Sequence, residues 1–296
     1  MTWTEIDLVA ELAKNQTEVC GIASWDSGKV ERFGSTVLIS YSSDQIRPGV
    51  LEQLDIWIQE SGLTIDRIYA KRLVVGPGKE DAPELIRGLA PEDPVSLVKE
   101  SGLSFEVDFQ GGYSCGLFLD QRANRLRLRE KKPARVLNTF AYTCSFSVAA
   151  AAVGAQTLSL DLAKDSLERG RRNFTHNGIS LDGHRFIADD VLDVLPRLVR
   201  REEKFDAIIL DPPTFSRGRS GRPFRVERDL PLLIELAVQC SAPGASILLS
   251  TNCTTIGVTE LHHMGEDIVP DAKFSPSHSQ PDIARHGAAT VWMQVP

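Results

Sequence analysis

The sequence lacks the patterns that mark a disulfide framework or a metal site. Its five cysteines are odd in number and widely scattered, and none forms a CxxC pair. Its six histidines show no metal-ligand spacing. We therefore expect no metal ion, no disulfide framework and a reducing, cytoplasmic location. The cysteines are Cys20, Cys115, Cys144, Cys240 and Cys253.

Long hydrophobic runs are also missing. No apolar stretch approaches the length of a membrane span, and the N-terminus MTWTEIDLVAEL lacks a basic and then apolar leader. We expect no membrane partner. The 42% hydrophobic and 25% charged content is ordinary for a globular protein, and 296 residues suffice for one large or two modest domains.

The chain has no overall excess of basic residues, which at first argues against a nucleic-acid partner. Its net charge is −7. The charge is uneven, however, because residues 1–110 hold 10 basic and 19 acidic residues, whereas the remainder holds 23 and 21. Local patches decide whether a protein binds phosphates. One such patch runs from Arg122 to Arg135, with seven basic residues against one Glu; it is either phosphate-facing or a solvated helix face.

The stretch from Ala134 to Asp161 predicts a βαβ unit. Arg135–Asn138 is typical of a buried strand, Phe146–Val153 of an Ala-rich helix, and Thr157–Leu160 of a second strand that ends at Asp161. In such a unit the helix N-terminus has unpaired N–H groups at the sheet edge, and the acid can accept from ribose hydroxyls. A βαβ unit without a ligand is the alternative.

A second motif follows the apolar run Phe205–Leu210. It reads Asp211-Pro212-Pro213-Thr214-Phe215. Proline fixes φ and removes a backbone donor, so this motif predicts a rigid loop at a strand end with carbonyl groups available to a ligand.

These motifs together resemble one family. VLNTFAYT, LSLD, the pair Asp189-Asp190 and DPPTF, in this order, resemble class I S-adenosylmethionine-dependent methyltransferases. Within that class they are similar to bacterial 23S ribosomal RNA methyltransferases with VLN-F-YT and DPP-F motifs. The likeness includes Gly116–Arg122 and covers roughly Ser101 to Thr255.

The resemblance implies an α/β fold with two domains. A Rossmann-like, doubly wound seven-stranded methyltransferase sheet is expected at 111–296, after a smaller N-terminal α/β module at 1–110. Family members often carry a further N-terminal RNA-binding barrel, and we expect this chain to be too short to hold one. A homodimer is left open.

The resemblance also implies the cofactor S-adenosylmethionine and its site. Asp161 would hold the ribose hydroxyls and Asp190 the adenine amino group, while Asp189 would either assist or cap the next helix. Cys144 and Ser145 depart from the glycines that the family has in its first loop, which predicts weaker cofactor binding. The expected cofactor-binding residues are Gln121, Arg122, Asn138, Thr139, Phe140, Tyr142, Thr143, Asp161, Asp189, Asp190, Asp211 and Pro212.

The implied substrate is a base of 23S ribosomal RNA, either cytosine C5 or a guanine nitrogen. Cytosine-5 enzymes first add a cysteine thiolate to carbon 6, so Cys253 is the candidate nucleophile. Asp211, with Pro212, would border the target base, and Cys253 and Asp211 are the expected catalytic residues. The setting Asn252-Cys253-Thr254 departs from the Ser-Cys-Ser of the cytosine branch. Asn252, together with Phe215, Phe224 and Arg228-Asp229, leans toward the guanine branch. The expected substrate-binding residues are Pro213, Phe215, Arg217, Arg219, Arg222 and Arg225.

Two other functions remain open. One is methylation of a small molecule or a protein, which the acidic total favours. The other is a degenerate fold that binds the cofactor or RNA without turnover, which Cys144 and Ser145 favour.

Patterns outside the motifs predict the remaining elements. We expect helices at Glu5–Lys14, Pro48–Ser61, Ala163–His176, Asp229–Cys240 and Gly257–Ile268. We expect strands at Val30–Ser40, Ile65–Val75, Leu103–Phe109, His184–Ala188, Ala245–Ser250 and, antiparallel, Thr290–Val295. We expect a turn at Gly76-Pro77-Gly78 and loops at Pro83–Pro94, Ser216–Arg228 and around His278, Pro281 and Asp282.

Overall fold

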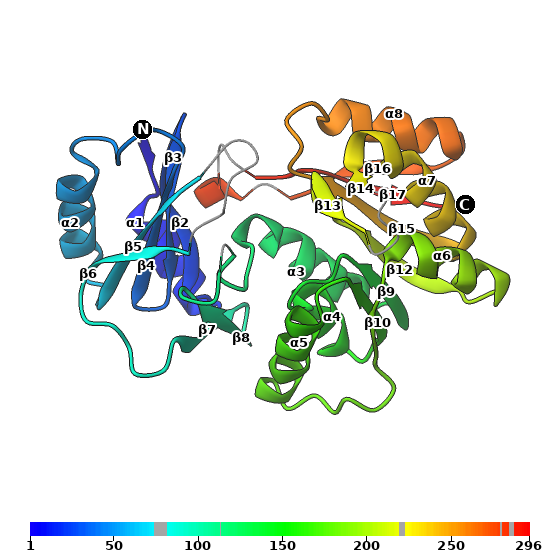
Figure 1. Cartoon of the computed structure of the whole chain (residues 1–296), viewed down its shortest axis with the longest axis horizontal. Helices are drawn as coiled ribbons and strands as arrows, with labels where there is room; N and C mark the ends of the chain where they lie inside the picture. The colour runs from blue at the N-terminus through cyan, green and yellow to red at the C-terminus, as the bar shows by residue number, and fades with distance from the viewer. Residues whose placement is uncertain (74–81, 113, 219–222, 279, 284–286) are drawn as a thin grey trace. The chain divides into compact units, whose positions relative to one another are not determined.

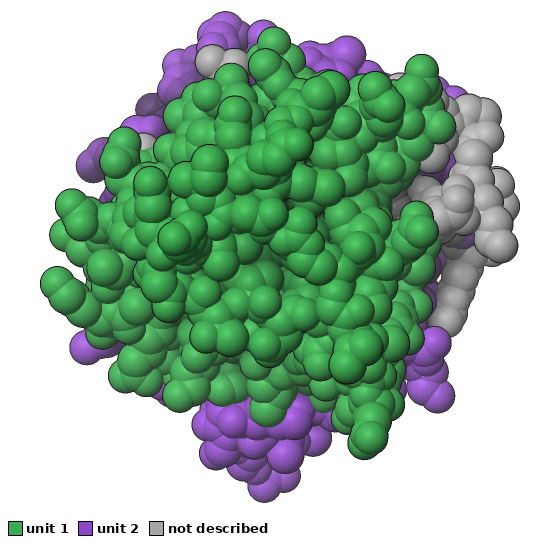
Figure 2. Space-filling model, turned by 90° about the vertical axis from the view of Figure 1, so that its left-hand side faces the viewer, with its two compact units in different colours: residues 1–120, 280–286 green, residues 121–279, 287–296 purple. Residues whose placement is uncertain are grey.

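A computed structural model describes residues 1–73, 82–112, 114–218, 223–278, 280–283 and 287–296. The chain divides into two compact units, which are coloured separately in Figure 2. Unit 1 contains Met1–Asp120 and Gln280–His286, and unit 2 contains Gln121–Ser279 and Gly287–Pro296. The domain boundary expected at residue 110 stays a prediction.

Unit 1 is built on a six-stranded sheet with its helices on one face (Figure 1). Helices α1 (Ile6–Lys14) and α2 (Val50–Ser61) share one apolar core with the strands, in which Val9 and Trp57 pack with Ile39. Only β4 and β5 are parallel, and α2 connects them. In spatial order the strands are β1 (Thr2–Trp3), β2 (Val19–Trp25), β3 (Gly28–Phe33), β4 (Thr36–Tyr41), β5 (Arg67–Arg72) and β6 (Glu84–Arg87).

The helices and several strands expected in this unit are confirmed, with one correction. Strand β6 lies inside Pro83–Pro94, which was expected to be a loop. Strands β2 and β7 (Val95–Glu100) were not predicted. Strand β7 pairs with β8 (Leu103–Asp108). The turn expected at 76–78 lies outside the described residues.

Unit 2 contains a seven-stranded sheet. Its order is β11 (Arg185–Ala188), β10 (Gln156–Asp161), β9 (Arg135–Thr139), β12 (Phe205–Leu210), β15 (Ser241–Thr251), β17 (Ala289–Gln294) and β16 (Lys273–Pro276). The first five are parallel, and β17 is antiparallel to both of its neighbours, so β16 runs in the same direction as the first five. Its helices are α3 (Arg122–Lys131), α4 (Ser145–Ala151), α5 (Lys164–His176), α6 (Val191–Arg200), α7 (Val226–Gln239) and α8 (Val258–Ile268). Short 3-10 turns lie at Leu119–Gln121 (η1) and Pro281–Ile283 (η2).

This sheet is buried on both faces, which explains its nearly continuous apolar strands. Successive side chains of β9 point to opposite faces, so Leu137 joins a core with α6, α7 and α8, whereas Val136 joins a core with α3 and α4. The predicted Rossmann-like fold is therefore confirmed, including the antiparallel last strand.

Several expectations for the second half of the chain are corrected. The expected loop Ser216–Arg228 contains a short hairpin of β13 (Phe215–Arg217) and β14 (Pro223–Arg225), and α7 begins at Val226 instead of Asp229. Strand β16 was not identified. Pro281–Ile283, expected to be loop, forms η2 and belongs to unit 1.

Candidate active site

The carboxyl ends of three neighbouring strands bring the expected acids to one edge of the sheet. Strand β9 pairs with β10 on one side and β12 on the other, and Thr139 is in register with both Leu160 and Leu210. The next residues after that register are Asp161 and Asp211. Two strand spacings separate them, roughly 10 Å. Asp189 and Asp190 follow β11, the strand beyond β10.

The loop between β9 and α4 has an unusual backbone. Phe140, Tyr142 and Cys144 all adopt positive φ, at 53°, 48° and 60°. Left-handed conformations cost non-glycine residues roughly 1–2 kcal/mol each, so neighbouring contacts must hold them. The Ala141 N–H donates to the Leu160 carbonyl at 2.8 Å, and the Asn173 side chain donates to the Thr143 carbonyl at 3.0 Å.

Cys144 lies where the resemblance predicts a glycine, and Gly170 leaves room for its side chain. Cys144 is fully buried at the start of α4. A Cβ atom on Gly170 of α5 would lie 2.4 Å from the Cys144 Sγ. Burial raises the pKa of the Cys144 thiol to about 12. The thiol is therefore a protonated packing group at neutral pH.

Asp161 ties this loop to strand β10. Its Oδ2 accepts from the Tyr142 N–H at 2.7 Å, and its Oδ1 accepts from the Ala163 N–H at 2.8 Å. Burial raises the pKa of Asp161, and these backbone donors oppose that shift. The Leu162 N–H is a third backbone donor to this carboxylate. The two oxygens have four lone pairs between them, so the group can still accept a hydrogen bond from a ligand.

Asn138 and Thr139 use their side chains inside the protein. Thr139 donates to the Ile209 carbonyl at 2.6 Å, and Asn138 donates to the Ser147 hydroxyl at 2.9 Å. Both side chains are buried. Asn138 thus joins β9 to α4, and Thr139 joins β9 to β12. Their expected cofactor contact stays a prediction.

The adjacent acids after β11 have separate roles. Asp190 caps α6, because its Oδ1 accepts from the Leu192 N–H at 3.0 Å. Asp189 forms an ion pair with Arg197 at 3.1 Å. The alternative in which Asp189 caps the helix is therefore wrong. Asp190 keeps a second carboxylate oxygen that accepts no hydrogen bond from the described residues.

Asp211 and the two prolines form a ledge next to β9. Pro212 is buried, Pro213 is exposed, and the Phe215 side chain is 51% exposed. The Ser250 hydroxyl donates to the Asp211 Oδ1 at 2.6 Å. The buried Gln121 side chain donates in turn to Ser250 at 2.8 Å. Gln121 thus reaches Asp211 through a serine, a link that the motifs did not reveal.

Cys253 has acidic and hydroxyl neighbours. It is 7% exposed, and its Sγ lies 3.1 Å from the Thr255 hydroxyl and 3.7 Å from a carboxylate oxygen of Glu227. Thr255 also donates to Glu227 at 2.6 Å. Reactive thiolates form in electropositive surroundings, which these contacts do not supply.

The hairpin after the ledge provides part of the expected substrate set. Arg225 is exposed at the start of α7, and its N–H donates to the buried Asp229 at 2.9 Å. Arg228 pairs with Asp229 at 2.7 Å. Phe224 is buried, with its ring 5.4 Å from that of Phe140. Arg219 and Arg222 lie outside the described residues, and the Arg217 side chain is not described.

Several basic residues of the run 122–135 are used for packing. Arg125 is 2% exposed and lies 5.7 Å from the centre of the Phe146 ring. Arg127 donates to the Pro276 carbonyl at 2.8 Å, and Arg135 stacks over Phe205 at 5.1 Å. Arg122, expected to bind the cofactor, is buried. The run is therefore not simply a solvated helix face.

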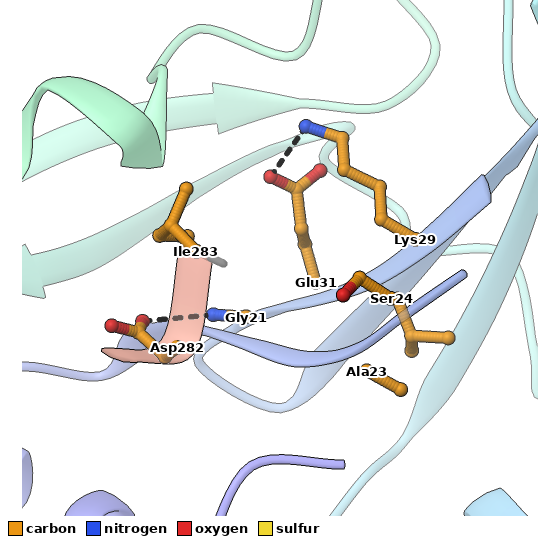
Figure 3. A pocket seen from close by; sticks show the side chains of 8 residues that line it. Gly21, Ala23, Ser24, Lys29, Glu31, Asp282 and Ile283 are labelled. Carbon is orange, nitrogen blue, oxygen red and sulfur yellow. Dashed lines mark hydrogen bonds and ion pairs between the residues drawn. The ribbon is translucent and has the colours of Figure 1, made fainter. Parts of the chain in front are cut away.

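A small pocket lies in unit 1 (Figure 3). Its volume is about 20 Å³, roughly the space of one water molecule. The Gly21 N–H donates to Asp282 at 3.1 Å beside it, and Lys29 pairs with Glu31 at 2.8 Å. It is too small for a nucleoside.

Neither a metal-ligand group nor a helix that could span a membrane occurs among the described residues. No group of three or more His, Cys, Asp or Glu among them could hold a metal ion. Within the same residues, none of the helices has the length and apolar character needed to cross a bilayer.

Curated proteins with similar sequences have ribosomal RNA in their names. The chain is 33% identical over 253 residues to "Ribosomal RNA large subunit methyltransferase I" of Klebsiella pneumoniae, covering 82% of this chain and 60% of that protein. It is 36% identical over 253 residues to the protein of the same name from an Enterobacter species, covering 82% and 61%. The chain thus spans about three fifths of the length of these relatives.

Solved structures support the same fold. A SAM-dependent methyltransferase from Agrobacterium tumefaciens matches with a TM-score of 0.74 and 19% identity, over 94% of this chain and 90% of that one. SMU.776, crystallised with SAH, matches with a TM-score of 0.80 and 24% identity, over 98% and 78%.

A family model gives the assignment. The model described as S-adenosylmethionine-dependent methyltransferase matches residues 79–282, a span that includes the βαβ loop, the acids of the sheet edge and the DPP ledge. With its strand order and these motifs, the chain belongs to the S-adenosylmethionine-dependent methyltransferase family.

Proposed function

We propose that this protein transfers a methyl group from S-adenosylmethionine to a base of large-subunit ribosomal RNA. The observation that carries the proposal is the row of Asp161, Asp190 and Asp211 along one sheet edge, beside the left-handed loop and an exposed proline–phenylalanine ledge. The ribosomal substrate rests on the names of the relatives, which are 33–36% identical. Such a substrate would place the protein in the cytoplasm.

The acceptor groups at the edge fit a nucleoside. Asp161 would accept from the ribose hydroxyls, because backbone donors anchor its oxygens and the carboxylate can still accept a further hydrogen bond. Asp190 would accept from the adenine amino group through the oxygen that does not cap α6. The loop from Phe140 to Cys144 would border the methionine part.

Methyl transfer from a sulfonium is an in-line displacement, so the protein mainly orients the acceptor. S-adenosylmethionine, when bound, supplies the methyl group and its own leaving group. Asp211 would accept a hydrogen bond from the acceptor base, and the exposed Phe215 would stack on a base of single-stranded RNA. Arg225 would contact phosphate.

The acceptor atom follows from the role of Cys253. In the cytosine route its thiolate adds to carbon 6, carbon 5 takes the methyl group, and loss of the carbon 5 proton expels the thiolate. The contacts with Thr255 and Glu227 favour instead a guanine nitrogen, which needs positioning and an acceptor for its proton.

A tritium-methyl assay on unmodified 23S ribosomal RNA tests the proposal. Cys253→Ala separates the two routes, with Cys240→Ala, another buried cysteine of unit 2, as the matched control. Full activity in Cys253→Ala removes the cytosine-5 route, and activity lost only in that variant supports it.

The same assay separates the other functions. Binding of S-adenosylmethionine by calorimetry without methylation of any RNA would favour a small-molecule or protein substrate, or a fold without turnover. Absence of cofactor binding would overturn the proposal.

A further inference from the structure

A buried chain of hydrogen bonds leads from the last strands of the sheet to Asp211. It starts at Trp292 on β17, passes through Asn124 and Gln121 beside α3, and reaches Ser250 on β15. Its final bond is the one from Ser250 to Asp211, at 2.6 Å. That length is typical of a hydroxyl that donates to an ionised carboxylate.

The chemistry of Trp292 fixes the direction of every bond in this chain. An indole N–H can only donate, so the atom of Asn124 that lies 2.9 Å from it must be the carbonyl oxygen. The Ser277 hydroxyl donates to the same oxygen at 2.7 Å. The Asn124 amide nitrogen therefore faces Gln121 and donates to its carbonyl oxygen at 2.8 Å.

The orientation of Gln121 follows from that of Asn124. Because its oxygen accepts from Asn124, its amide nitrogen faces Ser250 and donates to the hydroxyl oxygen. The Ser250 proton is then directed to Asp211. Amide orientations are ordinarily ambiguous, and here a donor-only group removes the ambiguity.

We propose that Ser250, Gln121 and Asn124 are positioning residues that keep Asp211 an ionised hydrogen-bond acceptor aimed at the substrate base. This role rests on the proposed function, because it assigns the acceptor of the methyl-transfer site. Asn124, Ser250 and Trp292 were not among the residues expected from the sequence.

Burial protects this network of hydrogen bonds from water. Gln121, Asn124 and Ser250 are each at most 2% exposed. Water therefore cannot replace a lost partner, and reversal of one amide would leave two like groups facing each other. As long as Trp292 is present, the hydrogen bonds from Trp292 to Asp211 can run in only one direction.

The first test measures Asp211 directly and needs no substrate. In protein labelled with ¹³C-aspartate, the Asp211 carboxyl signal is identified by its loss in Asp211→Asn and is titrated with pH. Ser250→Ala should raise the titration midpoint of Asp211 by about one pH unit, because a hydrogen bond to the charged form is lost. Asn124→Leu should shift it in the same direction by less, since it frees Gln121 to rotate.

Two variants control for packing and folding. Ser246→Ala removes another buried serine of β15, one that is not part of the hydrogen-bond network, and should leave the titration midpoint of Asp211 unchanged. Ser250→Cys preserves the volume of the side chain but supplies only a weak donor, so it should reproduce the shift even if Ser250→Ala does not fold. An unchanged midpoint in Ser250→Cys or Ser250→Ala would overturn the proposal.

The second test measures methyl transfer across pH at saturating S-adenosylmethionine. In Ser250→Ala the acid limb of the rate profile should move to higher pH by the same amount, with cofactor affinity within twofold of the wild type. If the midpoint shifts in Ser250→Ala but the wild-type protein methylates no RNA, the positioning role of the hydrogen-bond network is retained and the proposed function is rejected. If the wild-type protein methylates RNA but the midpoint does not shift in Ser250→Ala, only the positioning role is rejected.

Discussion

The two acids that flank the central strand are held in different ways. Asp161 accepts from the backbone N–H groups of Ala163, two residues later, and of Tyr142, 19 residues earlier. Asp211 accepts from the side chain of Ser250, 39 residues away, and this serine is oriented by residues on α3 and β17. The first acid is therefore held by backbone groups of the βαβ unit, and the second can be uncoupled by changing one side chain at a time.

The largest expected effect comes from removing the acid held by the backbone. Asp161→Ala should weaken S-adenosylmethionine binding by about 10- to 100-fold, because a charged hydrogen-bond acceptor contributes about 1.5–3 kcal/mol and the loop loses its anchor at Tyr142. Calorimetry gives the dissociation constants. Asp182→Ala, at an exposed acid, is the control. Equal affinity in wild type and Asp161→Ala would contradict the assignment of the ribose site.

The next effect tests how the left-handed loop tolerates Cys144. Gly170→Ala should lower the free energy of unfolding by about 1–3 kcal/mol, because the new methyl group overlaps the Cys144 sulfur. Cys144→Ala in the same chain should restore part of this loss. Urea denaturation of the two single variants and the double variant measures the coupling. Glu168→Ala, on an exposed position of α5, is the control, and additive effects would show that the two sites are independent.

A smaller effect distinguishes the two acids after β11. Asp190→Ala should cost about 1 kcal/mol of stability, since a helix cap is lost. Asp189→Ala should cost less, because its ion pair with Arg197 is partly exposed. Thermal unfolding of both variants gives the order, and a larger loss in Asp189→Ala would reverse the capping assignment.

The smallest effect is a pH dependence due to Asp161. Burial raises its pKa, so the folded protein holds this proton more tightly than the unfolded chain does. Stability from this group should therefore be greatest below the ordinary pKa of 3.8 and should fall as pH rises through the higher folded pKa. Urea denaturation at several acidic pH values should show a flatter profile for Asp161→Asn than for wild type. Identical profiles would argue that the acid is well solvated.

The sequence predicted most of unit 2, because its strands and helices carry strong local signals. Phe205–Leu210 is continuously apolar and ends at an acid and two prolines, and the strand has those bounds. Short elements were missed where the local signal was weak. Strand β16 holds only Lys273–Pro276, and β13 and β14 lie in an arginine-rich stretch that is typical of loops.

The positions of the acids in the site could be predicted from the sequence, but the residues that hold Asp211 in place could not. Asp161 and Asp211 follow apolar runs, so their place at the sheet edge is a local property. The partners of Asp211 come from positions as distant as Asn124 and Trp292, which only the folded sheet brings together. Likewise, nothing near Cys144 in the sequence shows that Gly170 makes space for its sulfur.

The return of Gln280–Ile283 to unit 1 has a consequence for how the chain matures during translation. The N–H of Gly21 has its acceptor on Asp282, 261 positions later, and a Cβ on Gly21 would lie 2.1 Å from the Asp282 carbonyl oxygen. A nascent polypeptide that has emerged only as far as residue 120 therefore lacks this closing piece. The first unit is completed only after residues 121–279, which form most of the second unit, have been synthesised.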